Sequence, residues 1–354
     1  MNGTRVVDVG GVKIGGDNPV VVQSMTNTAT EDVERTLRQV RGLVERGCEL
    51  VRVAVPDSTA GKALPKIVKN SPVPIIADIH YSPELAFMAL EAGVDKLRLN
   101  PGNITEEEAI GDIAKEARAR AIPIRVGVNS GSLDREIVEE FGRSAEAMVV
   151  SAEREIALLK REGFEDIVVS LKSSEVNTTI EANEIFSERY DYPLHLGVTE
   201  AGGGRSGLVK SSIGIGALLQ RGIGDTIRVS LTADPREEVA AAYDILRSLG
   251  LRDRGMDLVS CPTCGRTQVE VEEIGRQLEE RLGDLEDPVR VALMGCSVNG
   301  IGEAGSSDIG VVGTARGGVL YVNGEQEELI SAATTEAVVD RLESRIRNYL
   351  KNGE

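Results

Sequence analysis

Three cysteines near the end of the chain have the residue type and spacing to hold a metal centre. Cys261 and Cys264 form a close pair in CPTCGR, and Cys296 stands in GCSVNGIGE. Iron–sulfur clusters can leave one iron with a ligand other than thiolate, which is useful when a substrate must reach the metal. Glu303, expected in a glycine-rich turn after Cys296, is the candidate oxygen ligand. The glycines and the proline around the cysteines would let backbone N–H groups approach the cluster sulfurs.

Other readings of these cysteines stay open at this point. A structural zinc site normally has four protein ligands, so it would need Glu303 or a residue from elsewhere to complete it. A dithiol redox pair would use Cys261 and Cys264 but leave Cys296 without a role. The remaining cysteine, Cys48, precedes an apolar run and is expected to be a small buried hydrophobe.

Arginines interrupt four apolar runs, at Arg52, Arg98, Arg125 and Arg228. An arginine in a buried strand is costly unless it is paired or faces a polar cavity. The strand period of two places other polar residues on the same faces: Asn100, Asn129 and Ser230 beside arginines, and Ser170 beside Lys172. A structural ion pair would explain any one of these arginines. Four of them with Lys172, at equivalent positions, predict a site for a compact, multiply charged anion such as a diphosphate.

Further polar residues stand near the ends of two of these runs: Asp78, His80, His195 and Glu200. Either histidine could be a satisfied structural residue. Glu200 among cations would be a reasonable proton donor or orienting group. The loop after Glu200 contains the glycine pattern G-x-G-x-x-G at 202–207, but the acidic residue of a dinucleotide site is missing, so a phosphate cradle is the better reading.

The runs that carry these residues alternate with longer amphipathic stretches. Eight runs rich in Val, Ile and Leu are expected to be parallel strands covered by helices: 20–26, 50–55, 74–80, 96–101, 123–129, 166–172, 194–200 and 226–231. This repetition predicts an α/β fold with one N-terminal TIM (β/α)8 barrel rather than two doubly wound domains. The carboxyl ends of the strands would form the mouth of the active site, where the arginines converge.

Helix start signals precede several of the amphipathic stretches: Thr30 before 31–46, Ser82-Pro83-Glu84, Thr105 with Glu106–Glu108, and Asp234-Pro235 before 236–249. The leading VVDVGGVKIGG predicts a small hairpin that covers the bottom of the barrel.

The alternation ends after Gly250, and 248–260 is interpreted as a linker. A smaller α+β domain follows. Its expected elements are a helix at 268–282, a strand at 289–295, a hairpin at 309–324 with turns at 315–318 and 323–324, and a terminal helix at 334–350. We therefore expect a substrate-binding barrel at 1–252 and an iron–sulfur domain at 253–354.

Composition excludes several classes of protein. A net charge of −17 disfavours a nucleic-acid binder, since phosphate backbones require a basic surface. Only 3% of the residues are aromatic and Trp is absent, so stacking platforms for single strands are not expected. No apolar run approaches the length of a membrane span, and the N-terminus lacks the pattern of a secretory signal. The cytoplasm is the expected location.

The motifs together closely resemble the 4-hydroxy-3-methylbut-2-enyl diphosphate synthases. The likeness rests on CPTCGR and GCSVNGIGE behind a barrel with LRLNPGN, IRVGVNSGSL, LHLGVTEAG and IRVSLT, and it runs along essentially the whole chain. It implies the compact bacterial two-domain form. The implied reaction is the reductive ring opening and dehydroxylation of 2-C-methyl-D-erythritol 2,4-cyclodiphosphate to (E)-4-hydroxy-3-methylbut-2-enyl diphosphate, in the methylerythritol phosphate pathway to isoprenoids.

The resemblance also implies the parts of the site. A 4Fe–4S cluster on Cys261, Cys264 and Cys296, with Glu303 as exchangeable ligand, would receive electrons from reduced flavodoxin or ferredoxin. Glu200 resembles the acid near the reacting carbon. The residues similar to substrate ligands are Arg52, Arg98, Arg125, Asn129, Lys172, Arg228 and Ser230, with Asp78, His80 and His195 as further contacts. Family members are homodimers in which one subunit's cluster domain caps the other's barrel.

Two alternatives from other classes remain. The first alternative is a metal-independent enzyme for a phosphorylated or pterin-like substrate, with a structural zinc domain. It is suggested by the similarity of the barrel half to dihydropteroate synthases. A non-catalytic cluster-bearing electron carrier is the other, and it leaves the arginine-lined mouth unexplained.

Overall fold

The computed structural model describes residues 3–80, 82–99, 107–331 and 334–352. The chain divides into two compact units, Met1–Arg252 and Asp253–Glu354. The expected polar residue Asn100 and the expected helix start at Thr105 and Glu106 lie outside the described residues.

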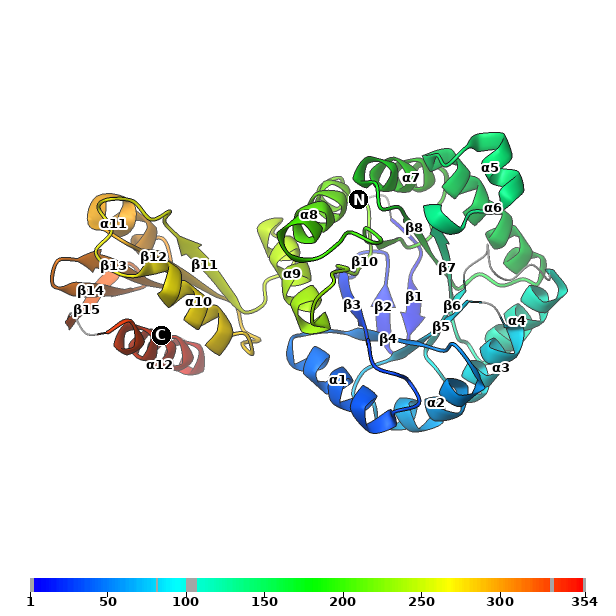
Figure 1. Ribbon diagram of the computed structural model, residues 1–354, viewed down its shortest axis with the longest axis horizontal. Coiled ribbons are helices and arrows are strands. Elements are labelled where there is room, and N and C mark those ends of the chain that lie inside the picture. Colours follow the sequence, from blue (N-terminus) through cyan, green and yellow to red (C-terminus); the bar gives the residue numbers. More distant parts are fainter. Residues whose placement is uncertain (1–2, 81, 100–106, 332–333, 353–354) are drawn as a thin grey trace. The chain divides into compact units, whose positions relative to one another are not determined.

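The eight strands predicted for the first unit form one parallel sheet that closes on itself (Figure 1). In chain order they are β3 (Val21–Met25), β4 (Leu50–Ala54), β5 (Ile75–Ile79), β6 (Lys96–Leu99), β7 (Ile124–Asn129), β8 (Ile167–Lys172), β9 (His195–Leu196) and β10 (Thr226–Ile227). Neighbouring strands follow the order β8-β7-β6-β5-β4-β3-β10-β9. A parallel bridge between Val169 and Leu194 joins the two ends of this order, so the prediction of a TIM barrel is confirmed.

A ring of helices surrounds these strands (Figure 1). They are α1 (Val33–Glu45), α2 (Ser58–Asn70), α3 (Pro83–Glu91), α4 (Glu107–Ala119), α5 (Arg135–Phe141), α6 (Ala145–Arg161), α7 (Val176–Arg189), α8 (Gly204–Gln220) and α9 (Pro235–Ser248). A short 3-10 turn at Ser130–Ser132 precedes α5, which is an addition to the simple alternation. No helix in the described part of the chain has the length and hydropathy needed to cross a bilayer.

The helix starts follow local capping chemistry. Pro83 and Pro235 occupy first-turn positions, as expected, because their missing N–H would have no partner there. The expected cap Thr30 is wrong. Asp32 caps α1 by accepting from the N–H of Arg35, while the Thr30 hydroxyl donates to the carbonyl of Ala54 over 2.6 Å. The carboxylate of Asp32, directly before the first residue of α1, caps the helix, because the hydroxyl of Thr30 already has a partner at the end of β4.

A hairpin closes the amino end of the barrel, as predicted. It consists of β1 (Val7–Val9) and β2 (Val12–Ile14), and its turn uses two glycines with positive φ. Its buried valines and Ile14 pack against residues near the starts of four barrel strands: Val21, Leu50, Ile76 and Val168. The apolar seal leaves the opposite, carboxyl end as the mouth.

The second unit is a five-stranded sheet with helices on both faces. Its strands are β11 (Met256–Ser260), β12 (Val289–Met294), β13 (Ile309–Thr314), β14 (Gly317–Val322) and β15 (Glu325–Ser331), in that order across the sheet. The first three are parallel and the last two antiparallel. Helices α10 (Val271–Arg281) and α12 (Thr335–Asn352) share a core with one face, and α11 (Ser297–Gly305) packs on the other. An α+β second domain is therefore confirmed.

Two elements of this sheet differ from the sequence prediction. Residues 256–260, interpreted as part of a linker, form the edge strand β11. Residues 325–331 form the strand β15, which pairs with β14 after the tight turn at Asn323 and Gly324. Its charged sequence lacks the hydrophobic pattern by which strands are predicted. Both strands owe their existence to pairing with a neighbour rather than to their own hydrophobic pattern.

Candidate functional site

The carboxyl ends of the barrel strands enclose a pocket lined mainly by charged and polar side chains. Its walls are Arg52, Asp78, His80, Arg98, Arg125, Asn129, Ser170, Lys172, Val198, Thr199, Arg228 and Ser230. Every residue predicted to contact substrate lines this pocket except His195. The residues come from strands far apart in the sequence, and the closed sheet brings them to one place.

Asp78 is the hub of one side of this pocket. Its carboxylate accepts from Arg98 Nη1 over 3.1 Å, lies 3.2 Å from His80 Nε2, and is 3.8 Å from Arg52 Nε. Burial by itself would raise the pKa of Asp78, but the charge of Arg52, the hydrogen bond with His80 and the charge of Arg98 hold the pKa well below its usual range. Asp78 therefore stays ionised and orients two guanidinium groups.

A second carboxylate, Glu238 on α9, holds Arg228. Glu238 is 3% exposed and accepts from Arg228 Nε and Nη2 over 3.3 Å, and from the N–H of Leu231 over 3.0 Å. Sequence reasoning missed this residue because a glutamate in the first turn of an amphipathic helix looks like a solvated charge. The sequence left open whether the arginines form structural ion pairs. Arg228 does so with Glu238, and Arg98 and Arg52 do so with Asp78.

Arg125 and Lys172 have no carboxylate partner in the described part of the chain. The Nε and Nη1 atoms of Arg125 are buried without a hydrogen-bond partner there. Burial, with the charges of Arg52 and Arg98, lowers the pKa of Arg125 well below its ordinary value. Burial, with the charges of Arg125 and Arg52, does the same to the pKa of Lys172. The pocket thus has more cations than carboxylates, and a bound anion would relieve the excess.

Two strand glycines make room for these cations. A Cβ at Gly127 would lie 2.6 Å from Arg98 Nε, and the carbonyl of Gly127 accepts from Arg98 Nη2 over 3.4 Å. A Cβ at Gly197 would lie 2.7 Å from Lys172 Nζ. A glycine inside a strand marks a close approach of other groups, so RVGV and HLGV carried a signal that sequence reasoning did not use.

His195 and Lys96 lie inside the barrel and do not line the pocket. His195 is fully buried, its Nδ1 is 3.4 Å from Thr226 Oγ1, and burial together with Lys172 lowers its pKa well below the ordinary value. Lys96 is also fully buried, and its Nζ has no hydrogen-bond partner among the described residues. The alternation in KLRL places Lys96 on the same face as Arg98, which would have identified it.

Glu200 lies just beyond the pocket wall, directly after Thr199. It is exposed and has a φ of 52°, a backbone conformation that non-glycine residues rarely adopt. Such strain is concentrated at functional sites. The following loop leads into α8, which starts at Gly204 with Gly203 as a cap that offers no side chain. Gly203 therefore gives the first N–H groups of α8 no side-chain cap, and the phosphate cradle predicted for this loop stays a prediction.

The cysteine motifs meet at one edge of the second unit's sheet. Cys261 follows β11 and Cys296 follows β12, and these parallel neighbours pair Ser260 with Leu293. The N–H of Gly295 donates to Cys261 Sγ over 3.1 Å, as expected for backbone groups approaching sulfur. The loop between β11 and α10, which carries Cys264, is attached to the same point, since the N–H of Gln268 donates to the carbonyl of Gly295 over 2.8 Å.

Cys296 is the N-cap of α11, in an extended conformation and without a side-chain capping bond. Cys296 therefore stands at the positive end of a helix, which favours a negatively charged group nearby. Glu303 was expected in a glycine-rich turn, but it lies within α11, two turns beyond Cys296. The prediction of a turn is wrong. Gly300 lets α11 pack closely on β13, since a Cβ at Gly300 would lie 2.7 Å from Val312 Cγ1, and this packing favours a continuous helix.

The described residues contain no group of three or more His, Cys, Asp or Glu that is gathered closely enough to hold a metal ion. The three cysteines of the two motifs are instead distributed around the same edge of the sheet. Cys48 is separate and buried, and burial raises the pKa of its thiol to about 12.

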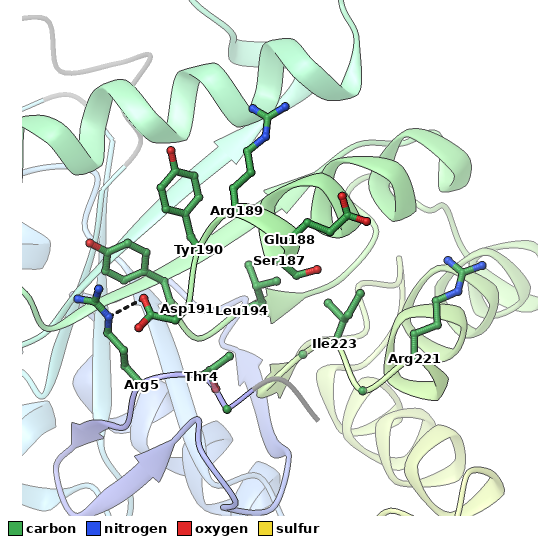
Figure 2. A pocket seen from close by; sticks show the side chains of 14 residues that line it. Thr4, Arg5, Ser187, Glu188, Arg189, Tyr190, Asp191, Leu194, Arg221 and Ile223 are labelled. Atoms are coloured by element: carbon green, nitrogen blue, oxygen red, sulfur yellow. Dashed lines mark hydrogen bonds and ion pairs between the residues drawn. The ribbon is translucent and has the colours of Figure 1, made fainter.

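A second pocket lies at the opposite end of the barrel (Figure 2). Its walls come from the segments that precede β9 and β10 and from the N-terminal segment with Thr4 and Arg5. Figure 2 shows Arg5 pointing to Asp191, with which it forms a bond of 2.7 Å, and Arg5 also pairs with Glu165. The charge of Arg5 is therefore already balanced by two carboxylates. Because the active sites of TIM barrels lie at the carboxyl ends of the strands, this pocket is not the candidate site.

Sequence comparison with known families decides the relationship. The GcpE TIM-barrel domain matches residues 4–243, and the GcpE protein C-terminal domain matches residues 257–348. The chain belongs to the GcpE family. A GcpE relative from Persephonella marina is 52% identical over 98% of this chain and 97% of its own length. One from Aquifex aeolicus is 50% identical over 99% and 98%. Both are named 4-hydroxy-3-methylbut-2-en-1-yl diphosphate synthase (flavodoxin), so the resemblance found in the motifs is confirmed.

Solved structures show the fold of the GcpE barrel alone. A dihydropteroate synthase from Yersinia pestis has a TM-score of 0.50 at 12% identity and covers 69% of this chain and 98% of its own. A phospho-2-dehydro-3-deoxyheptonate aldolase from Thermotoga maritima has a TM-score of 0.51 at 12% identity, covering 71% and 76%. At this identity the pterin-enzyme likeness supports a shared barrel and no shared substrate.

Proposed function

We propose that this chain catalyses the reductive ring opening and dehydroxylation of 2-C-methyl-D-erythritol 2,4-cyclodiphosphate to (E)-4-hydroxy-3-methylbut-2-enyl diphosphate. The observation that carries the proposal is the excess of cations at the barrel mouth, where Arg125 and Lys172 lack carboxylate partners in the described chain. The names of the GcpE relatives support the same reaction. Electrons and protons enter in this reaction, and water leaves.

The barrel residues would bind and orient the diphosphate. Arg125 and Lys172 supply charge that no described carboxylate neutralises, and Asp78 and Glu238 hold the neighbouring arginines in fixed orientations. Fixed cations cost little reorganisation when the anion arrives, so they stabilise negative charge more effectively than mobile ones would. Asn129 and Ser230, also on the pocket wall, would accept or donate hydrogen bonds to the ester oxygens or the sugar-derived hydroxyls.

The residues at the cysteine edge suit an iron–sulfur cluster. Cys261, Cys264 and Cys296 would hold a 4Fe–4S cluster, and the N–H of Gly295, which already donates to Cys261 Sγ, would stabilise its negative charge. When bound, such a cluster would supply electrons one at a time to the substrate. Glu303, on α11 two turns beyond Cys296, would be its exchangeable fourth protein ligand.

Glu200 would deliver a proton near the reacting carbon. Its left-handed backbone places an exposed carboxyl on the loop that follows the pocket residue Thr199. A loop carboxyl in this place could exchange protons with water between turnovers and then face the substrate.

The electron donor, assembly and location complete the proposal. A flavodoxin is the donor that the relatives' names support, and ferredoxin is the alternative. We also propose a homodimer in which each cluster domain caps its partner's barrel. Thiolate ligands require a reducing compartment, which favours the cytoplasm.

The first experiment is chemical analysis of protein purified and reconstituted without oxygen. Iron, acid-labile sulfide and zinc are measured together with the absorption spectrum. The proposal predicts about four irons and four sulfides per chain with charge-transfer absorption, followed by turnover of the cyclic diphosphate with a strong reductant. One zinc per chain without sulfide, even after reconstitution, would overturn the redox half of the proposal.

The substrate half is tested with Arg125→Ala. Removing a charged partner of an anion typically weakens binding by about thirtyfold or more. Calorimetric titration with the cyclic diphosphate should show this loss while iron content stays normal. The matched control is Arg120→Ala on the barrel surface, where Arg120 pairs with Glu116. Unchanged substrate affinity in Arg125→Ala would show that the anion site is elsewhere.

A further inference from the structure

The interior of the barrel below the mouth is polar. In TIM barrels the inward-facing side chains are mostly branched and apolar. Lys96 stands two residues before the pocket residue Arg98 and therefore shares the inner face of β6 with it. Gln23, on the inner face of β3 with Val21, and His195 on β9 are buried there as well. The Nζ of Lys96, the Nε2 of His195 and the side-chain amide of Gln23 have no hydrogen-bond partner among the described residues, which is rare for buried polar atoms.

Positive charges outnumber negative charges at the mouth. The four arginines of the pocket face two carboxylates, Asp78 and Glu238, in the described chain. Two positive charges therefore remain without a counter-charge before any lysine is counted. A guanidinium group holds its proton far more firmly than a lysine amine does. The lysines are therefore the groups that can give up their charge when no anion is bound.

Lys96 is fully buried, and the charges that act on it are positive. Burial, with the charges of Arg125 and Arg52, lowers the pKa of Lys96 well below its ordinary value. Lys96 is also close enough to His195 to contribute to the lowered pKa of that imidazole. Burial alone disfavours an ammonium group, and a lysine gives up its proton readily in such a place.

The neighbouring elements supply no carboxylate partner for Lys96 in the described chain. Its register partner on β5 is the apolar Ile76. Asp78, two residues further along β5, directs its carboxylate to Arg98. The other charged or titratable side chains that face the mouth are His80, Lys172 and Arg228, with Glu238 bound to Arg228. A negative charge near Lys96 must therefore come from a bound molecule.

The two positive charges that act on Lys96 belong to the pocket. Arg125 and Arg52 both line its wall. A diphosphate bound there would lie against these guanidinium groups, and its negative charges would offset the repulsion that they exert on Lys96. An anion at the mouth therefore favours the charged form of Lys96, although Lys96 does not line the pocket.

We propose that Lys96 is an uncharged amine in the substrate-free barrel and takes up a proton from the solvent when the diphosphate binds at the mouth. The inference rests on the proposed function for the identity of the anion. Lys96 is then a charge-regulating residue of the anion site and not a catalytic residue. Its neutral form adds no further positive charge to the empty site, and its protonated form attracts the bound diphosphate from below.

This proposal fixes the sign of the pH dependence of binding. The pKa of Lys96 is low in the substrate-free protein, and the anion raises it. Between the two pKa values, binding of the diphosphate takes up a proton, so a rise in pH through this window weakens binding.

The experiment measures binding of the cyclic diphosphate to the reconstituted protein by calorimetry, in buffers that differ in their enthalpy of ionisation, between pH 7 and pH 9. Each phosphorus of a cyclic diphosphate carries one strongly acidic oxygen, so the ligand itself does not titrate in this range. Wild-type protein is expected to take up between about half a proton and one proton per diphosphate, and its dissociation constant to rise by up to about tenfold per pH unit.

Variants at Lys96 assign the proton. Lys96→Met has no group that can take it up, so at least about half of the proton uptake and of the pH dependence should be lost. Lys96→Gln, which keeps a neutral polar group, should show the same loss and serves if the methionine variant does not fold. The matched control is Lys62→Met on the exposed side of α2, whose proton uptake should equal that of wild type.

Turnover with dithionite separates this inference from the proposed function. If the protein binds the cyclic diphosphate with proton uptake that depends on Lys96 but does not turn it over, the proposed function fails and this inference stands. If turnover is normal but wild-type protein takes up no proton, this inference is overturned and the proposed function stands. Proton uptake in both Lys96 variants equal to that of wild type overturns it as well. Absence of any binding to wild-type protein overturns both.

Discussion

The backbone N–H of Gly295 donates a hydrogen bond of 3.1 Å to the sulfur of Cys261, across the gap between β12 and β11. The two residues are far apart in the sequence, yet the parallel pairing of their strands brings both cysteine motifs to one edge. Hydrogen bonds to the cysteine sulfurs are among the features that tune an iron–sulfur cluster. The sheet therefore holds a backbone donor beside one of the proposed ligands.

Glu303→Ala is expected to leave most of the iron and sulfide in place, alter the absorption spectrum of the cluster, and reduce turnover by about a hundredfold. The three cysteines retain the cluster, while the exchangeable ligand is lost. Iron analysis, spectroscopy and steady-state turnover check this outcome. Glu272→Ala, in the exposed first turn of α10, is the control. If spectrum and rate are both unchanged, Glu303 is not a ligand.

Gly127→Ala is expected to weaken binding of the cyclic diphosphate by about tenfold, because the new Cβ would lie 2.6 Å from Arg98 Nε and displace that guanidinium. Calorimetric titration measures the affinity, and iron content should not change. Gly131→Ala is a matched control, since a Cβ there meets nothing within 4 Å. Equal affinities of the two variants would contradict the role assigned to Arg98.

Lys96→Met is expected to stabilise the substrate-free protein, more at pH 6 than at pH 9. Burial, with the charges of Arg125 and Arg52, lowers the pKa of Lys96 in the folded state, so the unfolded chain binds more protons below its ordinary pKa of 10.5. Wild-type stability therefore falls as the pH falls, and the methionine variant lacks this loss. Urea unfolding at both pH values is the measurement, with Lys62→Met on α2 as the exposed control. A gain that does not depend on pH would contradict the argument.

Glu155→Gln on α6 should show the opposite pH dependence. Glu155 is 3% exposed, and burial raises its pKa from 4.5 to about 7. The folded state then binds more protons than the unfolded state between these values, so wild-type stability falls as the pH rises through this window. The glutamine variant should be more stable at pH 8 by up to about 3 kcal/mol and little changed at pH 4.5. Urea unfolding checks this, with Glu181→Gln on α7 as the control, and a larger gain at the lower pH would refute it.

The repeated apolar runs were sufficient to predict the barrel. Each strand of a parallel barrel is covered by helices and is therefore apolar on a local scale, which makes β3 to β10 visible in the sequence. The arginines were visible for the same reason, because Arg98 or Arg125 contradicts the apolar run around it. The cysteine spacing, too, is a local property. These features predicted the fold class correctly and identified the candidate anion site and the cysteine motifs without any knowledge of packing.

Other features depend on contacts between distant residues, and only the tertiary structure decided them. Glu238 became the partner of Arg228 because α9 packs against β3, the neighbour of β10 in the sheet, and nothing in its own segment distinguishes it from a surface glutamate. The strand at 256–260 exists because β12 pairs with it, not because of its own pattern. His195 was expected to contact substrate, but it lies inside the barrel. Its place on β9 follows from the register of the closed sheet, which the sequence does not reveal. A sequence pattern indicates whether a residue is buried and in which kind of element it lies. The partner of a charge and the register of a strand depend on a second residue that is distant in the sequence.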